Sequence, residues 1–120
     1  SAREISRRLE AHFGSKVAVI ISDTHGRPLR EGIVGVAIGC WGMDPMRSYI
    51  GKPDRANRPM RSSVEAVADE LASAASLVCG QGAEVKPAVL VKGCNLPWKE
   101  CGSQSLKRSP EREIFSPKNS

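Results

Sequence analysis

The chain has 120 residues, a net charge of +5 at pH 7 and an apolar content of 40%. This length can bury one modest core, and two Trp, one Tyr and two Phe leave that core to be built mainly from aliphatic side chains. The charge suits polyanionic ligands such as nucleotides, phosphorylated metabolites or nucleic acid. No apolar run approaches membrane-spanning length and no signal peptide is visible, so we expect a soluble cytoplasmic protein.

The four cysteines show no C-x-x-C spacing and no histidine at zinc-ligand distance. We therefore expect free thiols rather than a zinc site or a disulfide framework. The residues concerned are Cys40, Cys79, Cys94 and Cys101. The chain lacks an initiator methionine and opens directly on a helix, so we interpret it as a fragment.

A capping box formed by Ser1 and Glu4 begins the first predicted element. Apolar residues then recur at fourfold spacing, and Gly14 is a natural helix terminator. We predict an amphipathic helix over residues 2–13. Its expected buried face consists of Ile5, Leu9 and Phe13.

The aliphatic run Val17–Ile21 predicts a strand buried on both faces, and Gly26 and Pro28 are expected to end it. Asp23 and Thr24 directly follow this run. Their hard oxygen atoms, held at the end of a buried strand, suit a Mg²⁺-type cation. The alternative is an ordinary turn in which both side chains bond the backbone.

Arg27 and Arg30 place fixed positive charge beside this candidate site, and we take them as candidate phosphate contacts. Beyond them, glycines alternate with small apolar residues over residues 33–42. This pattern predicts a strand that another backbone or a ligand approaches closely. Residues 43–61 form a connection rich in Pro, Arg and Gly, and loops of that length in compact domains are typically functional or mobile.

An alanine-rich stretch over residues 64–79 predicts a second helix, capped by Ser62 or Ser63. Its small side chains permit close packing against a neighbouring element, including a second subunit. Asp69 and Glu70 are adjacent and point about 100° apart on a helix, so they cannot converge as a catalytic pair. The expected buried face consists of Val64, Val67, Ala68, Leu71, Ala75 and Val78.

Two glycines flank Gln81 where this helix is expected to end. They free the backbone to wrap a ligand, and the Gln81 amide offers a neutral oxygen donor. The alternative is an ordinary helix-to-strand turn with Gly80 as C-cap. Beyond it we predict a strand at Ala88–Val91 and an irregular tail whose last residues, 116–120, are disordered.

Six segments taken together carry a family resemblance. They are I-I-S-D-T-H-G-R-P-L-R-E-G (20–32), V-A-I-G (36–39), D-P-M-R-S-Y-I-G-K-P-D (44–54), A-V-A-D-E-L-A-S-A-A-S-L-V (66–78), G-Q-G-A-E-V-K-P (80–87) and E-x-E-I-F (111–115). In this order and spacing they resemble the C-terminal half of the coenzyme F420-0:L-glutamate ligases, the gamma-glutamyl ligases of deazaflavin coenzyme biosynthesis. The resemblance covers residues 1–115.

The resemblance implies an α+β fold with a mixed sheet and packed helices, as an incomplete part of an intertwined homodimeric ligase. It also implies GTP-dependent addition of L-glutamate to coenzyme F420-0 through a gamma-linked amide, with an acyl phosphate intermediate. The implied cations are Mg²⁺ or Mn²⁺, with K⁺ as a further candidate. Neither a membrane nor nucleic acid is an expected partner.

Site residues also follow from the resemblance. It implies metal ligands at Asp23, Thr24 and Gln81. It implies a nucleotide-binding loop made of Cys79, Gly80, Gln81, Gly82, Ala83, Glu84, Val85 and Lys86. No catalytic acid or base is assigned.

Two other functions stay open at this point. A basic nucleic-acid-binding module would account for the net charge, although the cations are scattered and aromatic stacking residues are few. The second open function is that of a non-catalytic subunit, which dimerises through the alanine-rich helix. The family's N-terminal half is absent from this sequence, so we expect this chain alone to be inactive.

Overall fold

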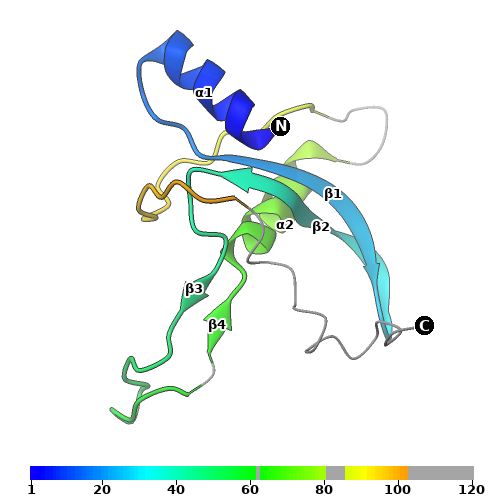
Figure 1. Cartoon of the computed structure of the whole chain (residues 1–120). Helices are drawn as coiled ribbons and strands as arrows, with labels where there is room; N and C mark the ends of the chain where they lie inside the picture. The colour runs from blue at the N-terminus through cyan, green and yellow to red at the C-terminus, as the bar shows by residue number, and fades with distance from the viewer. Residues whose placement is uncertain (62, 81–85, 103–120) are drawn as a thin grey trace, which may run out of the picture.

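The structure is a computed structural model that describes residues 1–61, 63–80 and 86–102. The predicted α+β class is confirmed (Figure 1). The described strands form two antiparallel pairs, β1–β2 and β3–β4, rather than the expected mixed sheet. The elements in chain order are α1 (Ala2–Phe13), β1 (Val19–Arg27), β2 (Arg30–Trp41), β3 (Arg47–Ser48), β4 (Val64–Glu65) and α2 (Val67–Cys79). Among these residues no helix is long and apolar enough to cross a membrane.

A long hairpin of β1 and β2 is the centre of the fold (Figure 1). β1 runs through Gly26 and ends at Arg27, directly before Pro28, so Pro28 ends the strand as predicted. The placement of Asp23 and Thr24 at the end of the strand is wrong. The reason is the length of β2, whose twelve residues extend the ladder past the polar stretch. The chain reverses at Pro28 and Leu29, and Leu29 has a left-handed backbone with φ 60°.

The two faces of the hairpin have different surroundings. Successive side chains of a strand point to opposite faces. Ile20 and Ala37 pack with Met43 and α2, whereas Ile21 and Ile38 lie on the side of the α1 N-terminus. The expected burial of the first strand on both faces is therefore wrong, because α2 covers only one face.

Gly35 determines how closely α2 approaches β2. A Cβ at this position would lie 2.6 Å from the Ala72 carbonyl oxygen and 3.1 Å from the Ser76 Cβ. Only glycine fits there without a shift of the helix backbone. The predicted close approach to the glycine-containing strand is confirmed, and the approaching element is the alanine-rich helix of the same chain.

Two side chains of α2 add hydrogen bonds to this contact. Asp69 Oδ1 accepts the N–H of Ala37 at 2.9 Å, and Ser73 Oγ donates to the Gly35 carbonyl at 2.6 Å. Ala37 adjoins a bulge, since the register shifts between Ile21 and Ser22 and Ile38 has no direct partner on β1. Asp69 therefore has a structural role, satisfying a strand donor next to the bulge.

The second helix begins later than predicted. Residues 64–65 pair with β3 as strand β4, which leaves Ala66 as N-cap in place of the expected serines. Ser63 instead accepts the N–H of Tyr49 through its carbonyl, and Ser62 lies outside the described residues. Gly80 caps the end of α2 as predicted. The buried residues are Val67, Ala68 and Ala72, whereas Val64 and Val78 are largely exposed.

α1 has the predicted bounds but not the predicted buried face. Ile5 and Phe13 are 43% and 66% exposed, because the helix contacts the hairpin through Ala2 and Ser6. Ser6 Oγ donates to the carbonyl of Val17 at 2.7 Å. Ser1 is the N-cap but makes no side-chain cap bond.

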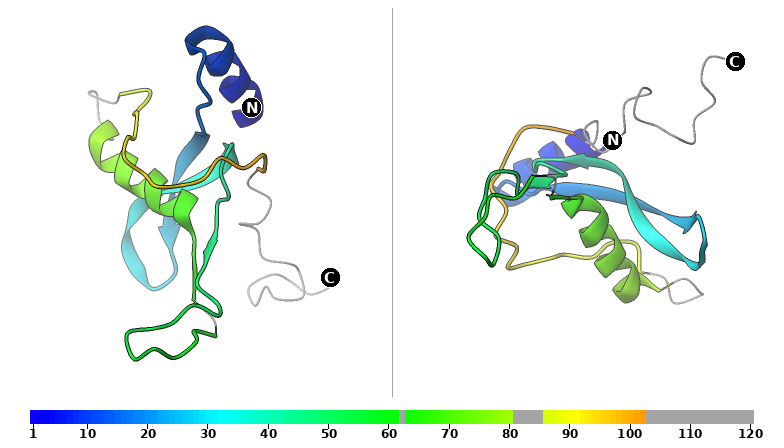
Figure 2. Two further views of the ribbon diagram at one scale, coloured as in Figure 1. Left: turned by 90° about the vertical axis from the view of Figure 1, so that its left-hand side faces the viewer. Right: turned by 90° about the horizontal axis from the view of Figure 1, so that it is seen from below.

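Residues 47–61 and 63–65 belong to an arm that projects from the body in Figure 1 and in the left view of Figure 2. β3 and β4 begin it, and backbone bonds between Gly51, Lys52 and Met60 continue the pairing. At its tip Asp54 Oδ1 accepts two backbone N–H groups. The predicted long connection is thus an extended two-stranded hairpin.

The segment after the second helix differs from prediction. The predicted strand Ala88–Val91 is wrong, since these residues pair with no described strand. The segment is also poorly buried, and the side chain of Leu90 is 71% exposed. Further along, Gly102 makes an antiparallel bridge with Trp41. The predicted disordered tail, 116–120, lies outside the described residues.

Gly35→Ala should lower the free energy of unfolding by about 1–3 kcal/mol, because the added methyl overpacks the helix contact. Gly26→Ala is the matched control in the same hairpin, since a Cβ there meets nothing within 4 Å. It should change the free energy by less than about 0.5 kcal/mol. Urea denaturation measures both, and equal effects would contradict the close-approach account.

Asp69→Ala should cost about 1–3 kcal/mol, because it leaves the partly buried N–H of Ala37 without its acceptor. Asp69→Asn should recover most of this loss, since its amide oxygen still accepts. Denaturation curves of both variants separate a hydrogen-bonding role from one that needs the charge. An asparagine variant as unstable as the alanine variant would show that the charge matters.

Candidate functional site

Asp23 and Thr24 lie in the middle of β1, where their side chains point to opposite faces. Thr24 pairs with Gly35 and so shares the face that α2 covers. Asp23 is exposed on the other face, and its Oδ1 accepts the N–H of Thr24 at 2.8 Å. The two residues offer hard oxygen atoms on both faces of one strand.

The predicted nucleotide loop starts close to Thr24. Ser76, in the last turn of α2, lies against Gly35, the strand partner of Thr24. Cys79 ends the helix, and its carbonyl accepts the N–H of Lys86 at 3.1 Å. This bond joins the two ends of the loop beside the helix terminus. Gln81, Gly82, Ala83, Glu84 and Val85 lie outside the described residues.

Arg27 and Arg30 face each other across the hairpin turn, and both are exposed. Arg27 Nη2 donates to the Glu31 carbonyl at 3.2 Å. Arg27 lies four positions beyond Asp23 along β1, a separation of about 13 Å at ~3.3 Å per residue. A ligand that contacts both residues must itself be extended.

The donor set fits a hard divalent cation but is sparse. Carboxylate and hydroxyl oxygens are the ligands that Mg²⁺ and Mn²⁺ prefer. Across the described part of the chain, no three His, Cys, Asp or Glu side chains gather as a metal cluster. The four cysteines are free, as predicted, and burial raises the pKa of the Cys40 thiol to about 11, which keeps it protonated.

One polar cluster at the base of the arm was not predicted. Tyr49 Oη donates to Glu65 Oε1 at 3.0 Å and accepts from Arg47 Nη1 at 3.2 Å. The carboxyl groups of Glu65 and Glu70 share a hydrogen bond, which lowers the pKa of Glu65 and raises the pKa of Glu70. The cluster fastens β3 and β4 to the start of α2. Because only the pairing of β3 with β4 brings these residues together, no sequence pattern indicates the cluster.

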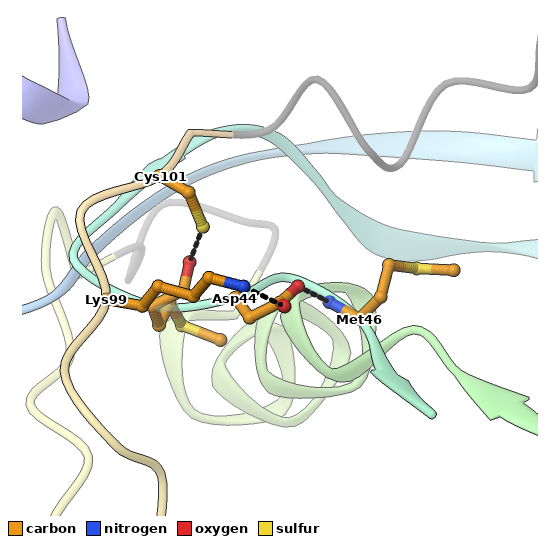
Figure 3. A network of polar contacts seen from close by, with 5 residues as sticks. Asp44, Met46, Lys99 and Cys101 are labelled. Atoms are coloured by element: carbon orange, nitrogen blue, oxygen red, sulfur yellow. Dashed lines mark hydrogen bonds and ion pairs between the residues drawn. The ribbon is translucent and has the colours of Figure 1, made fainter. Parts of the chain in front are cut away.

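A second unpredicted network ties the C-terminal described segment to the connection between β2 and β3 (Figure 3). Asp44 accepts the Met46 N–H at 3.0 Å and the Lys99 ammonium at 3.1 Å. Cys101 Sγ donates to the Met43 carbonyl at 3.0 Å. The Met46 bond, helped by Lys99, holds the pKa of Asp44 below its usual range, and Asp44 raises the pKa of Lys99.

The Asp44–Lys99 contact should make stability fall at both pH extremes. Because the pKa of folded Asp44 is lowered, its contribution is present above 3.8, the ordinary value, and is lost as pH falls through the folded value. Because the pKa of folded Lys99 is raised, its contribution is present below 10.5 and is lost as pH rises through the folded value. Solvent exposure keeps both contributions small.

Urea denaturation of the wild type and of Asp44→Asn at a series of pH values measures how the free energy of unfolding falls at acid pH. The wild type should be the more stable near neutrality, and the difference should vanish at low pH. A difference that does not change with pH would contradict the ionic account.

Comparison with known proteins places this chain in a family. The family model described as F420-0:gamma-glutamyl ligase matches residues 1–93. A coenzyme F420:L-glutamate ligase of Methanothermobacter thermautotrophicus is 46% identical over 119 residues, covering 96% of this chain and 46% of that protein. Proteins of the same name from Archaeoglobus fulgidus and Methanopyrus kandleri are 41% and 44% identical, each over 96% of this chain. They are covered over 46% and 47% of their own lengths.

The chain therefore spans about half the length of these relatives, and the family match covers the hairpin, both helices and the arm. The resemblance expected from the sequence is confirmed: the chain belongs to the F420-0:gamma-glutamyl ligase family.

Proposed function

We propose that this chain carries part of the metal and nucleotide site of a GTP-dependent ligase that adds L-glutamate to coenzyme F420-0. The product bond is a gamma-linked amide. Family membership supports this proposal, because the relatives are named coenzyme F420:L-glutamate ligases. GTP is made in the cytoplasm, which we propose as the compartment of the reaction.

The observation that carries the proposal is the contact between α2 and the strand partner of Thr24. The last turn of α2 is held against Gly35 on β2, which pairs with Thr24 on β1, and the loop beginning at Cys79 follows directly. In the proposed site Asp23, Thr24 and Gln81 ligate Mg²⁺ or Mn²⁺, and residues 79–86 hold the GTP phosphates. Arg27 and Arg30 contact the outer part of the same extended ligand, and K⁺ is a further candidate cation.

The chemistry is phosphoryl transfer followed by amide formation. A carboxylate oxygen of the acceptor bonds to the γ-phosphorus of GTP, and the bond from that phosphorus to the β–γ bridging oxygen breaks, releasing GDP. The glutamate amine then attacks the acyl carbon, inorganic phosphate leaves, and the amine loses a proton. A divalent cation offsets charge on the transferred group, and this chain's glycine-rich loop and arginines supply further positive potential.

The proposed active unit needs more polypeptide than this chain. The chain covers 46% of the Methanothermobacter relative, and the described residues provide only one exposed carboxylate, Asp23, in the proposed cation site. We propose that the 120 residues alone do not ligate glutamate and that the complete enzyme is a homodimer. Glutamate ligation by this chain alone would contradict the first statement.

One observation favours the nucleic-acid alternative. The arm exposes four cations that make no ion pair within the described part of the chain: Lys52, Arg55, Arg58 and Arg61. Such a module would bind RNA or duplex DNA with an affinity that falls steeply with salt. The ligase proposal predicts instead a requirement for a divalent cation.

Asp23→Asn should weaken Mg²⁺-dependent GTP binding at least about tenfold, because it removes a charged metal ligand. Calorimetry measures this on a full-length protein in which the chain is fused to the part of the Methanothermobacter ligase that it does not match. Glu31→Gln is the matched control, since it removes an exposed carboxylate from the same hairpin and should leave affinity unchanged.

Equal affinities for Asp23→Asn and the wild type would remove Asp23 from the site. No GTP binding by the restored protein, in the presence or absence of Mg²⁺, would leave only the nucleic-acid and structural alternatives.

A further inference from the structure

His25 is an exposed histidine that the proposed site does not use. It lies on β1 two positions after Asp23, and both side chains are exposed. In the described part of the chain, no hydrogen bond, ion pair or ring contact engages its imidazole. A nitrogen donor is therefore available close to the candidate cation ligand.

The register of the hairpin places His25 and Asp23 on one face of β1. From Ser22 to Gly26 every residue pairs with β2 without a shift, because both register shifts lie outside this stretch. Side chains two positions apart are then neighbours, about 6.6 Å apart along the strand at ~3.3 Å per residue. Thr24, between them, points to the opposite face. The residue that shares the face of Asp23 is thus His25.

The surroundings of this pair suit a bound ion. Across the ladder Asp23 and His25 pair with Val36 and Val34, which are part-buried and offer no competing side-chain donor or acceptor. Apolar neighbours lower the local dielectric constant and so strengthen the attraction between an ion and its ligands. Asp23 Oδ1 accepts the N–H of Thr24, and within the described residues Oδ2 has no hydrogen-bond partner.

The positive charge of Arg27 does not oppose a cation at this pair. The register shifts between Gly26 and Arg27, so the regular alternation of side chains ends before Arg27. Its guanidinium donates to the Glu31 carbonyl at 3.2 Å, at the hairpin turn. Along the strand Arg27 is about 13 Å from Asp23, farther than the ~8 Å over which salt screens charges at physiological ionic strength.

A carboxylate and an imidazole together favour a transition metal over Mg²⁺. Mg²⁺ binds oxygen ligands and keeps several waters, so an added nitrogen donor contributes little to its binding. First-row transition metals accept carboxylate oxygen and imidazole nitrogen in the same site. An imidazole beside the carboxylate should therefore raise the affinity for such a metal and leave the affinity for Mg²⁺ unchanged.

We propose that His25 ligates a transition-metal ion together with Asp23 and makes this site prefer Mn²⁺ over Mg²⁺. The inference rests on the proposed function, in which Asp23 is a metal ligand, and it decides between the two divalent cations named there. Two protein donors leave the remaining coordination positions to water or to phosphate oxygens of a nucleotide.

The test measures binding of Mn²⁺ alone, without nucleotide, to the 120-residue chain. Electron spin echo envelope modulation of the bound Mn²⁺ should show coupling to an imidazole ¹⁴N nucleus. His25→Phe should remove this coupling and weaken Mn²⁺ binding at least about tenfold, because it keeps a ring but loses the donor. His12→Phe is the matched control, since His12 is the other histidine of the chain and is exposed on α1. It should keep both the coupling and the affinity.

Competition between Mg²⁺ and Mn²⁺, followed by the paramagnetic resonance signal of free Mn²⁺, gives a second measurement. His25→Phe should lower the preference for Mn²⁺ while the Mg²⁺ affinity stays unchanged. Asp23→Asn should weaken the binding of both ions. Circular dichroism should show equal thermal transitions for wild type and His25→Phe, since the side chain is exposed.

Bound Mn²⁺ without nitrogen coupling would overturn the proposal. So would a folded His25→Phe variant with wild-type Mn²⁺ affinity, or a wild-type chain that binds no Mn²⁺. If Asp23→Asn alone weakens Mn²⁺ binding, Asp23 keeps its proposed role and His25 is not a ligand. Because no nucleotide is present, these outcomes are distinguishable from a failure of GTP binding.

Discussion

The fold depends on one close approach, that of the α2 backbone to Gly35 on β2. The Ala72 carbonyl lies where a side chain would begin, so the contact requires a strand residue without a Cβ. Asp69 and Ser73 then hydrogen-bond to the β2 backbone, at Ala37 and at Gly35 itself. Packing and hydrogen bonding therefore fix the same position of the helix on the sheet.

This contact gives the hairpin two unlike faces and so arranges the candidate site. Thr24 and the start of the loop at Cys79 lie on the side of α2, whereas Asp23 is exposed on the opposite side. A site that uses both residues must reach around or past one strand. In the proposed site the nucleotide loop approaches from the helix side, and Asp23 belongs to the other face of the strand.

Both helices could be predicted from the sequence because their signals are local. Gly14 and Gly80 end them as expected. The extents of the strands could not be predicted, since they depend on the partner strands. Pairing with β2 extends β1 through the polar S-D-T stretch. Pairing with β3 makes a strand of Val64 and Glu65, the residues around the predicted start of α2. The same limit applies to the site. Residue types and spacing selected Asp23 and Thr24, but only the extension of β1 through both residues shows that their side chains lie on opposite faces.

Paramagnetic broadening by Mn²⁺–GTP tests the central claim most directly, because it reports distance from the bound metal at each backbone amide. In the full-length protein restored with the remaining ligase polypeptide, the account predicts that the amide signals of Asp23 and Thr24 broaden together with those of Gly80 and Lys86. Other parts of the hairpin and the arm should broaden much less. Broadening centred on the arm, with sharp signals at Thr24 and Gly80, would contradict it.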